Sequence, residues 1–493
     1  MRSFVLFLSS FFLLGCFFLT NAMLVSESRA QNSPDMNIEG DAEEEGFGDE
    51  GEDEGFGDEE GDAFQEIEIE AAVQNVVVDK GYVFGGFVKE DLAYSFHEPD
   101  SAFKFTRTEA ELNKIRLTLN LYLEFDLSEE WEAKISGNSF YDAYYAEKGR
   151  EKFPNETLDA YERELDLRDT FVEGPLSEEI RIKIGRQIIA WGESEGLAII
   201  DMANPRDNLE LGLVDIEDAR IPVFATKLSY LSGTWEGNLV AIHEFRSNKN
   251  ATEGSDFDPF ISIRGAFPVK KEELPEEETE WLARFFKSFN GGDLSLVYAD
   301  VFEDNPYLDF ESFAFTPRYQ RIKTFGVSGN LVRGSWLFKL EMARKRGAAF
   351  GRNDLEKQLR RGLMNPKSWS EKDMTQLMLG FDYSGVTDLS ATFEFNITKI
   401  EDYPNNLANQ ELRAAPSLNL RYDTWNNTLH PQFLWVRLPN DNGDLYRLSG
   451  NYDYIDALRI SVGIAVYDAS KTDDLLYPYR HNDRVFGGVK YSF

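Results

Sequence analysis

The chain has little of what most catalytic and metal-binding sites are built from. It holds one cysteine, Cys16, among 493 residues, so no disulfide can form within it. Its four histidines form no HExxH pair, and none lies in a recognisable nucleophile motif. The sequence therefore predicts a protein that is not an enzyme and that holds no metal ion and no cofactor.

Positive charge and long apolar runs are also scarce. Lys and Arg total 51 against 88 Asp and Glu, which gives a formal net charge of −37. No basic stripe runs along the chain, so nucleic acid is not an expected partner. After residue 30 no apolar run reaches the length of about 18 residues that a transmembrane helix needs.

Residues 1–30 are typical of a secretory signal peptide. An apolar run, Phe4–Leu19, is followed by Ser28-Arg29-Ala30, which fits a cleavage site. An alternative stays open, because Leu13-Leu14-Gly15-Cys16 resembles a lipoprotein motif that would place a lipid on the cysteine. In both cases we expect the chain to leave the cytoplasm.

Residues 31–79 form an acidic segment of low complexity. They contain 19 Asp and Glu and no Lys or Arg. Like charges at this density repel one another, and the few apolar side chains cannot offset the entropy lost on folding. We expect a disordered tail in the periplasm, and the alternative is a tether for a basic partner or for divalent cations.

From Gly81 to Phe493 apolar and polar residues alternate with period two. The pattern is clearest at 113–127, where six apolar residues share one face. These apolar faces are about ten residues long, which suits a tilted strand in a bilayer better than the common strand of five or six residues. The sequence therefore predicts that residues 80–493 form an all-β, antiparallel transmembrane barrel.

Short and long connections alternate along the same region, a habit of outer-membrane barrels. Short turns are expected at Ser128-Glu129-Glu130, Pro175-Leu176-Ser177, Ser232-Gly233, Arg333-Gly334, Val386-Thr387, Asn426-Asn427 and Asp456. Long loops are expected at 97–111, 147–162, 191–219, 346–373, 401–411, 438–444 and 469–481. Since an even number of strands must separate two short turns, we expect about 18 strands, with 16 as the alternative.

The interval between Gly233 and Gly334 tests this count. Three strands are evident there and parity requires a fourth, for which 260–267 is the candidate. Residues 270–289 would then lie on the short-turn side, where we expect a surface helix that caps the barrel or docks onto a partner or membrane. Its apolar residues recur at helical spacing: Trp281, Leu282, Phe285, Phe286 and Phe289.

The C-terminus alternates up to a terminal aromatic residue. Tyr491 and Phe493 lie on the apolar face of 485–493. A last strand that ends in an aromatic residue resembles the signal read by the outer-membrane barrel-insertion machinery. That machinery and the outer-membrane lipid bilayer are therefore expected partners.

The stretch 180–232 differs from the rest, because a long irregular segment separates its two alternating ends. Its motifs are Gly185-Arg186-Gln187, Trp191-Gly192-Glu193, Asn204-Pro205-Arg206-Asp207 and Arg220-Ile221-Pro222. They resemble those of a large, uncharacterised family of Gram-negative outer-membrane β-barrels, whose genes often lie beside lipid-transporting exporters of the resistance-nodulation-division type. The resemblance implies a porin-like barrel over residues 80–493, with a pore or hydrophobic-substrate role.

The loop 191–219 is the candidate pore constriction. In porins a loop of this length often folds into the lumen, where charged groups select ions by sign. The candidate residues are Arg186, Glu193, Glu195, Asp201, Arg206, Asp207, Asp215, Glu217, Asp218 and Arg220. The alternatives are a solvent-exposed surface loop and a cation site at Asp215, Glu217 and Asp218, whose spacing matches no EF-hand loop.

Arg186 shares its face with Ile184 and Ile188, which would point to lipid. A charge there costs about 2–4 kcal/mol near the membrane midplane. Either a bulge at Gly185 turns Arg186 into the lumen, or Arg186 lies near the rim, and we expect the bulge.

Three functions remain open. The first is an outer-membrane channel for small or hydrophobic molecules. The second is an outer-membrane partner of an inner-membrane lipid exporter, reached through the acidic tail. The third is a soluble, secreted β-sandwich, which the long apolar strand faces argue against.

Overall fold

A computed structural model describes residues 81–97, 110–196, 199–213, 219–258, 266–276, 279–363, 365–439, 443–471, 474 and 476–493. All of them belong to the unit Gln74–Phe493. The expected signal peptide with Cys16 and the acidic tail therefore lie outside the described residues. No helix in the described ranges is long and apolar enough to cross a membrane.

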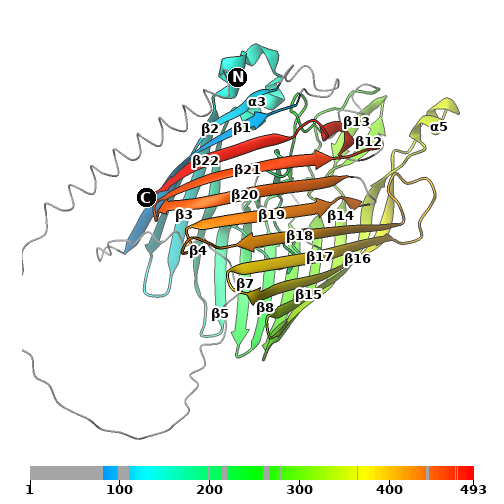
Figure 1. Ribbon diagram of the computed structural model, residues 1–493. Coiled ribbons are helices and arrows are strands. Elements are labelled where there is room, and N and C mark those ends of the chain that lie inside the picture. Colours follow the sequence, from blue (N-terminus) through cyan, green and yellow to red (C-terminus); the bar gives the residue numbers. More distant parts are fainter. Residues whose placement is uncertain are drawn as a thin grey trace, which may run out of the picture. The chain divides into compact units, whose positions relative to one another are not determined.

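Eighteen antiparallel strands form one closed sheet (Figure 1). In chain order these are β1 (Tyr82–Ser95), β2 (Glu111–Asp126), β3 (Glu132–Asp142), β4 (Arg163–Pro175), β5 (Ile180–Gln187), β7 (Val223–Ser232), β8 (Trp235–Ile242), β10 (Glu280–Phe289), β11 (Gly292–Phe302), β14 (Arg321–Arg333), β15 (Trp336–Gly351), β16 (Trp369–Val386), β17 (Leu389–Ile400), β18 (Leu412–Tyr422), β19 (Leu429–Arg437), β20 (Asp444–Ile455), β21 (Leu458–Asp468) and β22 (Arg484–Ser492). The prediction of 18 strands is confirmed, and the alternative of 16 is wrong.

The first and last strands close the sheet. β1 pairs with β22 from Phe87↔Ser492 to Ser95↔Arg484. The terminal Phe493 continues this pairing, because its backbone exchanges two hydrogen bonds of 3.0 Å with Gly86. Since every strand has two neighbours, the chain forms a barrel, and the alternative of a β-sandwich is wrong.

Tight turns lie at one end of the barrel and long loops at the other. All seven expected short turns fall between consecutive strands, and Asn290-Gly291 adds an eighth. The long loops contain the short elements α2 (Tyr144–Lys148), η2 (Arg150–Lys152), α3 (Asn155–Tyr161), β6 (Asp207–Asn208), β9 (Lys249–Asn250), β12 (Tyr307–Glu311), β13 (Ala314–Arg318), α5 (Leu355–Arg360) and η4 (Tyr477–Tyr479). The loop expected at 346–373 is shorter, because β15 extends to Gly351 and β16 begins at Trp369.

The surface helix expected within 270–289 is wrong. Residues Glu280–Phe289 form strand β10, which pairs with β8 and β11 and supplies the strand that parity requires. Most of 260–267 lies outside the described residues. Leu282 is buried on the inner face while Trp281 and Phe285 are exposed on the outer face, so the apparent helical stripe combines residues from both sides of a strand.

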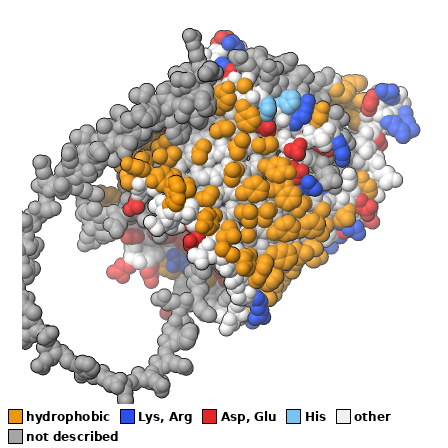
Figure 2. Space-filling view, viewed as in Figure 1, with side chains coloured by type: hydrophobic (Ala, Val, Ile, Leu, Met, Phe, Trp, Pro, Cys, Tyr) orange, Lys and Arg blue, Asp and Glu red, His pale blue; other side chains and the backbone are white. Residues whose placement is uncertain are grey.

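The wall alternates between an apolar outer face and a mixed inner face, as the sequence predicts. On β15, Phe338, Leu340 and Met342 are exposed, whereas Lys339 and Glu341 are buried in the interior. Figure 2 shows hydrophobic side chains spread across the outer surface of the strands. This pattern belongs to a transmembrane β-barrel.

Candidate functional site: a loop fixed inside the barrel

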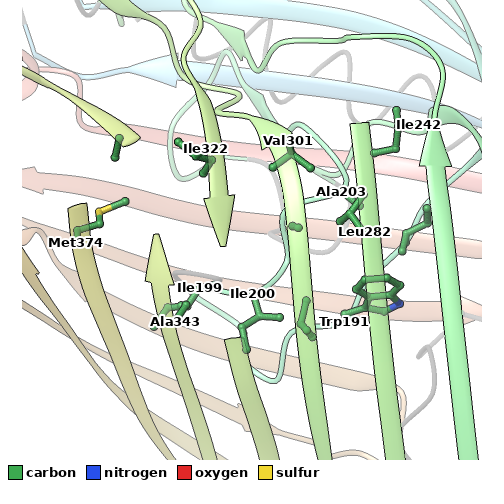
Figure 3. Close-up of a cluster of buried hydrophobic side chains, with 14 of the residues drawn as sticks. Trp191, Ile199, Ile200, Ala203, Ile242, Leu282, Val301, Ile322, Ala343 and Met374 are labelled. Carbon is green, nitrogen blue, oxygen red and sulfur yellow. The ribbon is translucent and has the colours of Figure 1, made fainter. Parts of the chain in front are cut away.

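The loop between β5 and β7 (residues 188–222) turns into the barrel instead of standing above it. Trp191, Ile199 and Ile200 pack against inward-facing apolar side chains of the wall (Figure 3). Ile200 has no solvent-exposed surface. These wall residues come from eight strands, β7, β8, β10, β11, β14, β15, β16 and β17, and they include Val240, Leu282, Val301, Ile322, Ala343 and Met374. Burying each large apolar side chain contributes about 1.5–3 kcal/mol, so the segment is held firmly to one side of the lumen.

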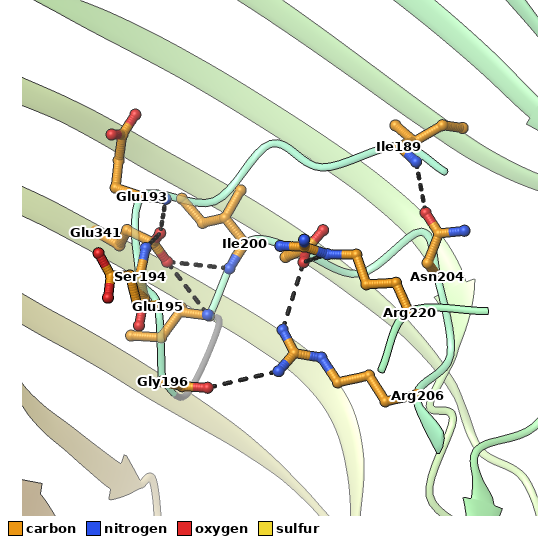
Figure 4. Close-up of polar contacts among 12 residues, drawn as sticks. Ile189, Glu193, Ser194, Glu195, Gly196, Ile200, Asn204, Arg206, Arg220 and Glu341 are labelled. Carbon is orange, nitrogen blue, oxygen red and sulfur yellow. Dashed lines mark hydrogen bonds and ion pairs between the residues drawn. The ribbon is translucent and has the colours of Figure 1, made fainter. Parts of the chain in front are cut away.

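Glu341 of β15 is the first polar anchor of this loop. Its carboxylate is fully buried and accepts backbone hydrogen bonds from Glu193, from Ser194 (3.0 Å), from Ile199 (3.2 Å) and from Ile200 (3.3 Å) (Figure 4). An irregular backbone in a protein interior needs hydrogen-bond acceptors for its N–H groups, and here one carboxylate accepts from four of these N–H groups.

Gly192 explains part of the Trp-Gly motif. A Cβ atom at this position would lie 3.1 Å from Oε1 of Glu341, so a side chain would crowd the anchor. Gly196 lies in the same way beside the second anchor, where an added Cβ would come within 3.2 Å of Oε2 of Glu394. Both glycines therefore permit the backbone to approach a wall carboxylate closely.

Glu394 of β17 is the second anchor. It accepts hydrogen bonds from the Ser194 hydroxyl (2.8 Å), the Glu195 backbone (2.8 Å) and the Gly196 backbone (3.1 Å). Its negative charge is balanced by Lys339 of β15, whose Nζ lies 3.8 Å from Glu394 and 2.9 Å from Asp382 of β16. The anchors thus belong to a charge network of the wall.

The carboxylates of the loop tip lie between anchored backbone and open lumen. Glu193 accepts a hydrogen bond from Asn330 of β14 (3.2 Å). Burial raises the pKa of the Glu193 carboxyl, and repulsion from Asp293 raises it further. Glu195 accepts a hydrogen bond from Asn419 of β18 (3.0 Å) and lies 3.7 Å from the Arg421 guanidinium.

A strongly basic sector of the wall adjoins this acidic tip. The inward-facing rows of β18–β21, all four fully described, contain Asp453 as their single acidic residue. Their arginines are Arg413, Arg421, Arg447 and Arg459. The tip and this sector therefore bring opposite charges together where Glu195 meets Arg421.

A single carboxylate, Asp201, forms ion pairs with two arginines in the second half of the loop. Arg206 lies 3.4 Å and Arg220 2.9 Å from its Oδ2 atom. Asn204 adds three hydrogen bonds, because it accepts one from the Ile189 backbone (2.6 Å) and donates to the carbonyls of Gln187 (3.2 Å) and Ile221 (2.9 Å). The two arginine motifs of the sequence therefore close the base of the loop.

The loop then crosses toward β1–β3. Asp207 of β6 bridges in parallel to Lys249 of β9, and burial raises the pKa of the Asp207 carboxyl. Glu210 lies 2.5 Å from Lys114 and 3.5 Å from Arg116, both of β2. Burial alone would raise the pKa of Glu210, but these two cations lower it to about 2. A second part of the loop is thus fixed by buried ion pairs.

Arg186 is not turned inward by a bulge. The pairings of β5 with β4 and β7 run through Gly185 without a register shift, and Arg186 lies opposite the exposed Phe224. The rim alternative holds instead, because Arg186 is the next-to-last residue of β5 and binds Glu244 (3.0 Å) and the Leu167 carbonyl (3.1 Å).

Most of the predicted site residues lie on the inserted loop, but not all of them. Six candidates lie on the inserted loop: Glu193, Glu195, Asp201, Arg206, Asp207 and Arg220. Arg186 lies on β5, and Asp215, Glu217 and Asp218 lie outside the described residues. Among the described residues no group of three or more Asp, Glu, His and Cys could hold a metal ion.

Sequence reasoning missed the anchors on the wall. Glu341 and Glu394 each interrupt an apolar strand with a charge on the inner face, which is also what any lumen-lining residue does. A single inward-facing carboxylate on a strand gives no signal of the distant loop that it binds.

These features define a transmembrane β-barrel whose lumen is narrowed by an inserted loop. Residues 95–493 match the family described as "Protein of unknown function (DUF1302)", and the chain belongs to this family. No curated protein matches the chain.

Several solved structures are similar to this chain at low sequence identity. OccAB4 of Acinetobacter baumannii is 8% identical, with a TM-score of 0.49, and the match covers 84% of this chain and 98% of that one. OprB of Pseudomonas putida is 10% identical with a TM-score of 0.45, over 86% and 97% of the two chains. The outer membrane channel DcaP of A. baumannii is 12% identical with a TM-score of 0.41, over 84% and 97%.

Proposed function

We propose that this protein is an outer-membrane channel for small solutes, narrowed by the loop between β5 and β7. The observation that carries this proposal is the pair of buried wall carboxylates, Glu341 and Glu394, that hold the loop against the inner wall. A loop outside the barrel would need no such partners. Fixed inside, it sets the cross-section and the charge of the passage.

The charge arrangement predicts how the channel acts on solutes. Glu195 projects from the loop beside Arg421 of β18, whereas Glu193 accepts a hydrogen bond from Asn330 of β14. Opposite charges on facing sides of a narrow aqueous passage orient dipolar solutes and select ions by sign. Glu195 and Arg421 are the residues at which the two sides meet.

Ion selectivity tests the proposal. Purified protein in planar bilayers under a salt gradient gives a reversal potential. Replacing Glu195→Gln should shift that potential toward anions, and Arg421→Gln should shift it toward cations, because each removes one charge from the same contact. A folded, heat-modifiable protein that passes no ions would overturn the proposal.

Location and assembly follow from the same account. The apolar outer wall fits the outer membrane. The short turns, the start of β1 and the end of β22 then lie on the periplasmic side. Phe493 extends the last strand and pairs with Gly86, which suits a signal for the barrel-insertion machinery. Partnership with an inner-membrane exporter depends on the acidic tail, and transport after deletion of residues 35–64 tests it.

A further inference from the structure

The wall of the barrel is not continuous between β4 and β5. On one edge β4 pairs with β3 from Tyr141↔Arg163 to Glu132↔Glu173, with one register shift between Gly137↔Leu167 and Ile135↔Thr170. On the other edge it pairs with β5 only from Thr170↔Arg186 to Pro175↔Arg181. Residues 163–169 therefore have a strand on one side only, and an open strand edge is not tolerated in hydrocarbon without cover.

The strand beside the break is short. β5 has 8 residues, whereas β15 has 16 and β16 has 18. A strand needs about 9–11 residues to cross the hydrocarbon, so the wall is low beside β4. Leu165, 86% exposed, and Leu167, 46% exposed, face outward along the unpaired stretch, as lipid-facing residues do.

Charged side chains close the break in place of backbone hydrogen bonds. Arg246 donates to both carboxylate oxygens of Asp166 (3.1 and 3.2 Å) and to the Pro222 carbonyl (2.9 Å). Above it, Lys249 lies 2.6 Å from Glu164. Each of these contacts joins β4 to a segment of the long loops rather than to a strand of the barrel wall.

Two further arginines complete this ladder. Arg186 donates to the Leu167 carbonyl (3.1 Å) and to Glu244 (3.0 Å). Arg168 donates to the Arg220 carbonyl (2.9 Å). Side-chain contacts of this kind can separate and re-form while all paired strands keep their backbone hydrogen bonds. Opening the wall anywhere else would break the backbone hydrogen bonds of a strand pair.

Apolar surface lies on the outer side of the ladder. Phe224 is exposed there next to Arg186. On the inner side the carbonyls of Arg220 and Pro222 accept hydrogen bonds of the ladder, and the neighbouring Ile221 and Val223 are buried. A molecule with an apolar chain thus finds apolar contacts outside the break, next to the charged groups of the ladder.

We propose that this break is a lateral portal, closed here by its ion-pair ladder, for amphipathic molecules that carry one apolar chain and a charged or polar head group. The head group exchanges with the ladder while the chain passes beside Leu165 and Leu167 into the outer leaflet. This proposal rests on the proposed function, because the molecule reaches the portal through the same lumen.

A reversible lock on the portal tests it. Because Cys16 is the only native cysteine, paired cysteines can be placed in the full-length chain. Asp166→Cys with Arg246→Cys spans the break, and a short bismaleimide joins them. The matched control is Leu119→Cys with Ser139→Cys, which are direct partners on the outer face of the continuous β2–β3 pair.

Two probes are followed in liposomes. The rate of transfer of a fluorescent fatty acid from water into the bilayer, taken above the rate in empty liposomes, reports the portal, and swelling with a small sugar reports the axial channel. Joining the 166/246 pair should reduce fatty-acid transfer to the level of empty liposomes while sugar-driven swelling persists, and joining the control pair should change neither.

The failures are distinguishable. Fatty-acid transfer that survives the 166/246 lock, or that the control lock also stops, overturns the portal. Uptake of sugar without any fatty-acid transfer by the unlocked protein overturns the portal but leaves the channel. A folded protein that moves neither probe overturns the proposed function and the portal with it.

Discussion

Replacing Glu341→Ala should release the inserted loop from the wall. Four backbone N–H groups, of Glu193, Ser194, Ile199 and Ile200, would lose their acceptor. Each buried N–H without a partner costs about 1–3 kcal/mol, or about 4–12 kcal/mol for the four. Burial of Ile199 and Ile200 offsets only about 3–6 kcal/mol, so we expect the segment 193–200 to leave the wall and recover hydrogen bonds with water.

Hydrogen–deuterium exchange of the peptide that contains 193–200 measures this release. A loss of about 4 kcal/mol of local stability corresponds to about a thousandfold faster exchange. Glu124→Gln is the matched control, because Glu124 is a carboxylate on β2 whose ion pair is with Lys134, at 2.9 Å. Unchanged protection of 193–200 in a folded Glu341→Ala barrel would refute the assignment of Glu341 as the anchor.

Three further predictions follow from the same contacts. The folded-state pKa of Glu210 is lowered to about 2, so the stabilisation from its ion pairs is complete above the usual pKa of 4.5 and is lost as pH falls from there toward 2. The wild-type loop should therefore lose about 3 kcal/mol of stability over this range, measured by proteolysis in acid titrations, and Glu210→Gln should not. Because the pKa of Glu193 is raised, acidification should protonate it before ordinary carboxyls, and cation preference measured by reversal potential should decline earlier in wild type than in Glu193→Gln. Phe493→Ala should reduce the heat-modifiable fraction in outer membranes, since the Phe493 ring packs 6.5 Å from Phe84 at the closing seam, and a normal fraction would argue against the insertion signal.

The barrel could be predicted from the sequence because its constraints are periodic. Alternation fixes which residues face lipid, as at 113–127, and the parity of short turns fixes an even strand count. The same reasoning failed at 280–289, where apolar residues occur on both faces because Leu282 packs under the inserted loop. Period two and helical spacing cannot be told apart in such a segment.

The site could be predicted only in part. The motifs around Trp191, Arg206 and Arg220 identify the loop, since irregular sequence with several carboxylates stands out from strands. Its anchors on β15 and β17 lie more than 100 residues away in the chain, where a single inward carboxylate looks like any lumen-lining residue. Arg186 was misplaced because parity gives the face of a residue but not its height in the wall.

Single-channel conductance in planar bilayers tests the central claim most directly. Wild-type protein is compared with a variant in which residues 193–200 are replaced by a short Gly-Ser linker, after both are shown to be folded by heat-modifiability. The account predicts discrete conductance steps for wild type and larger steps for the variant, because the inserted loop narrows the lumen. Absence of steps from folded wild type, or equal steps from both proteins, would contradict it.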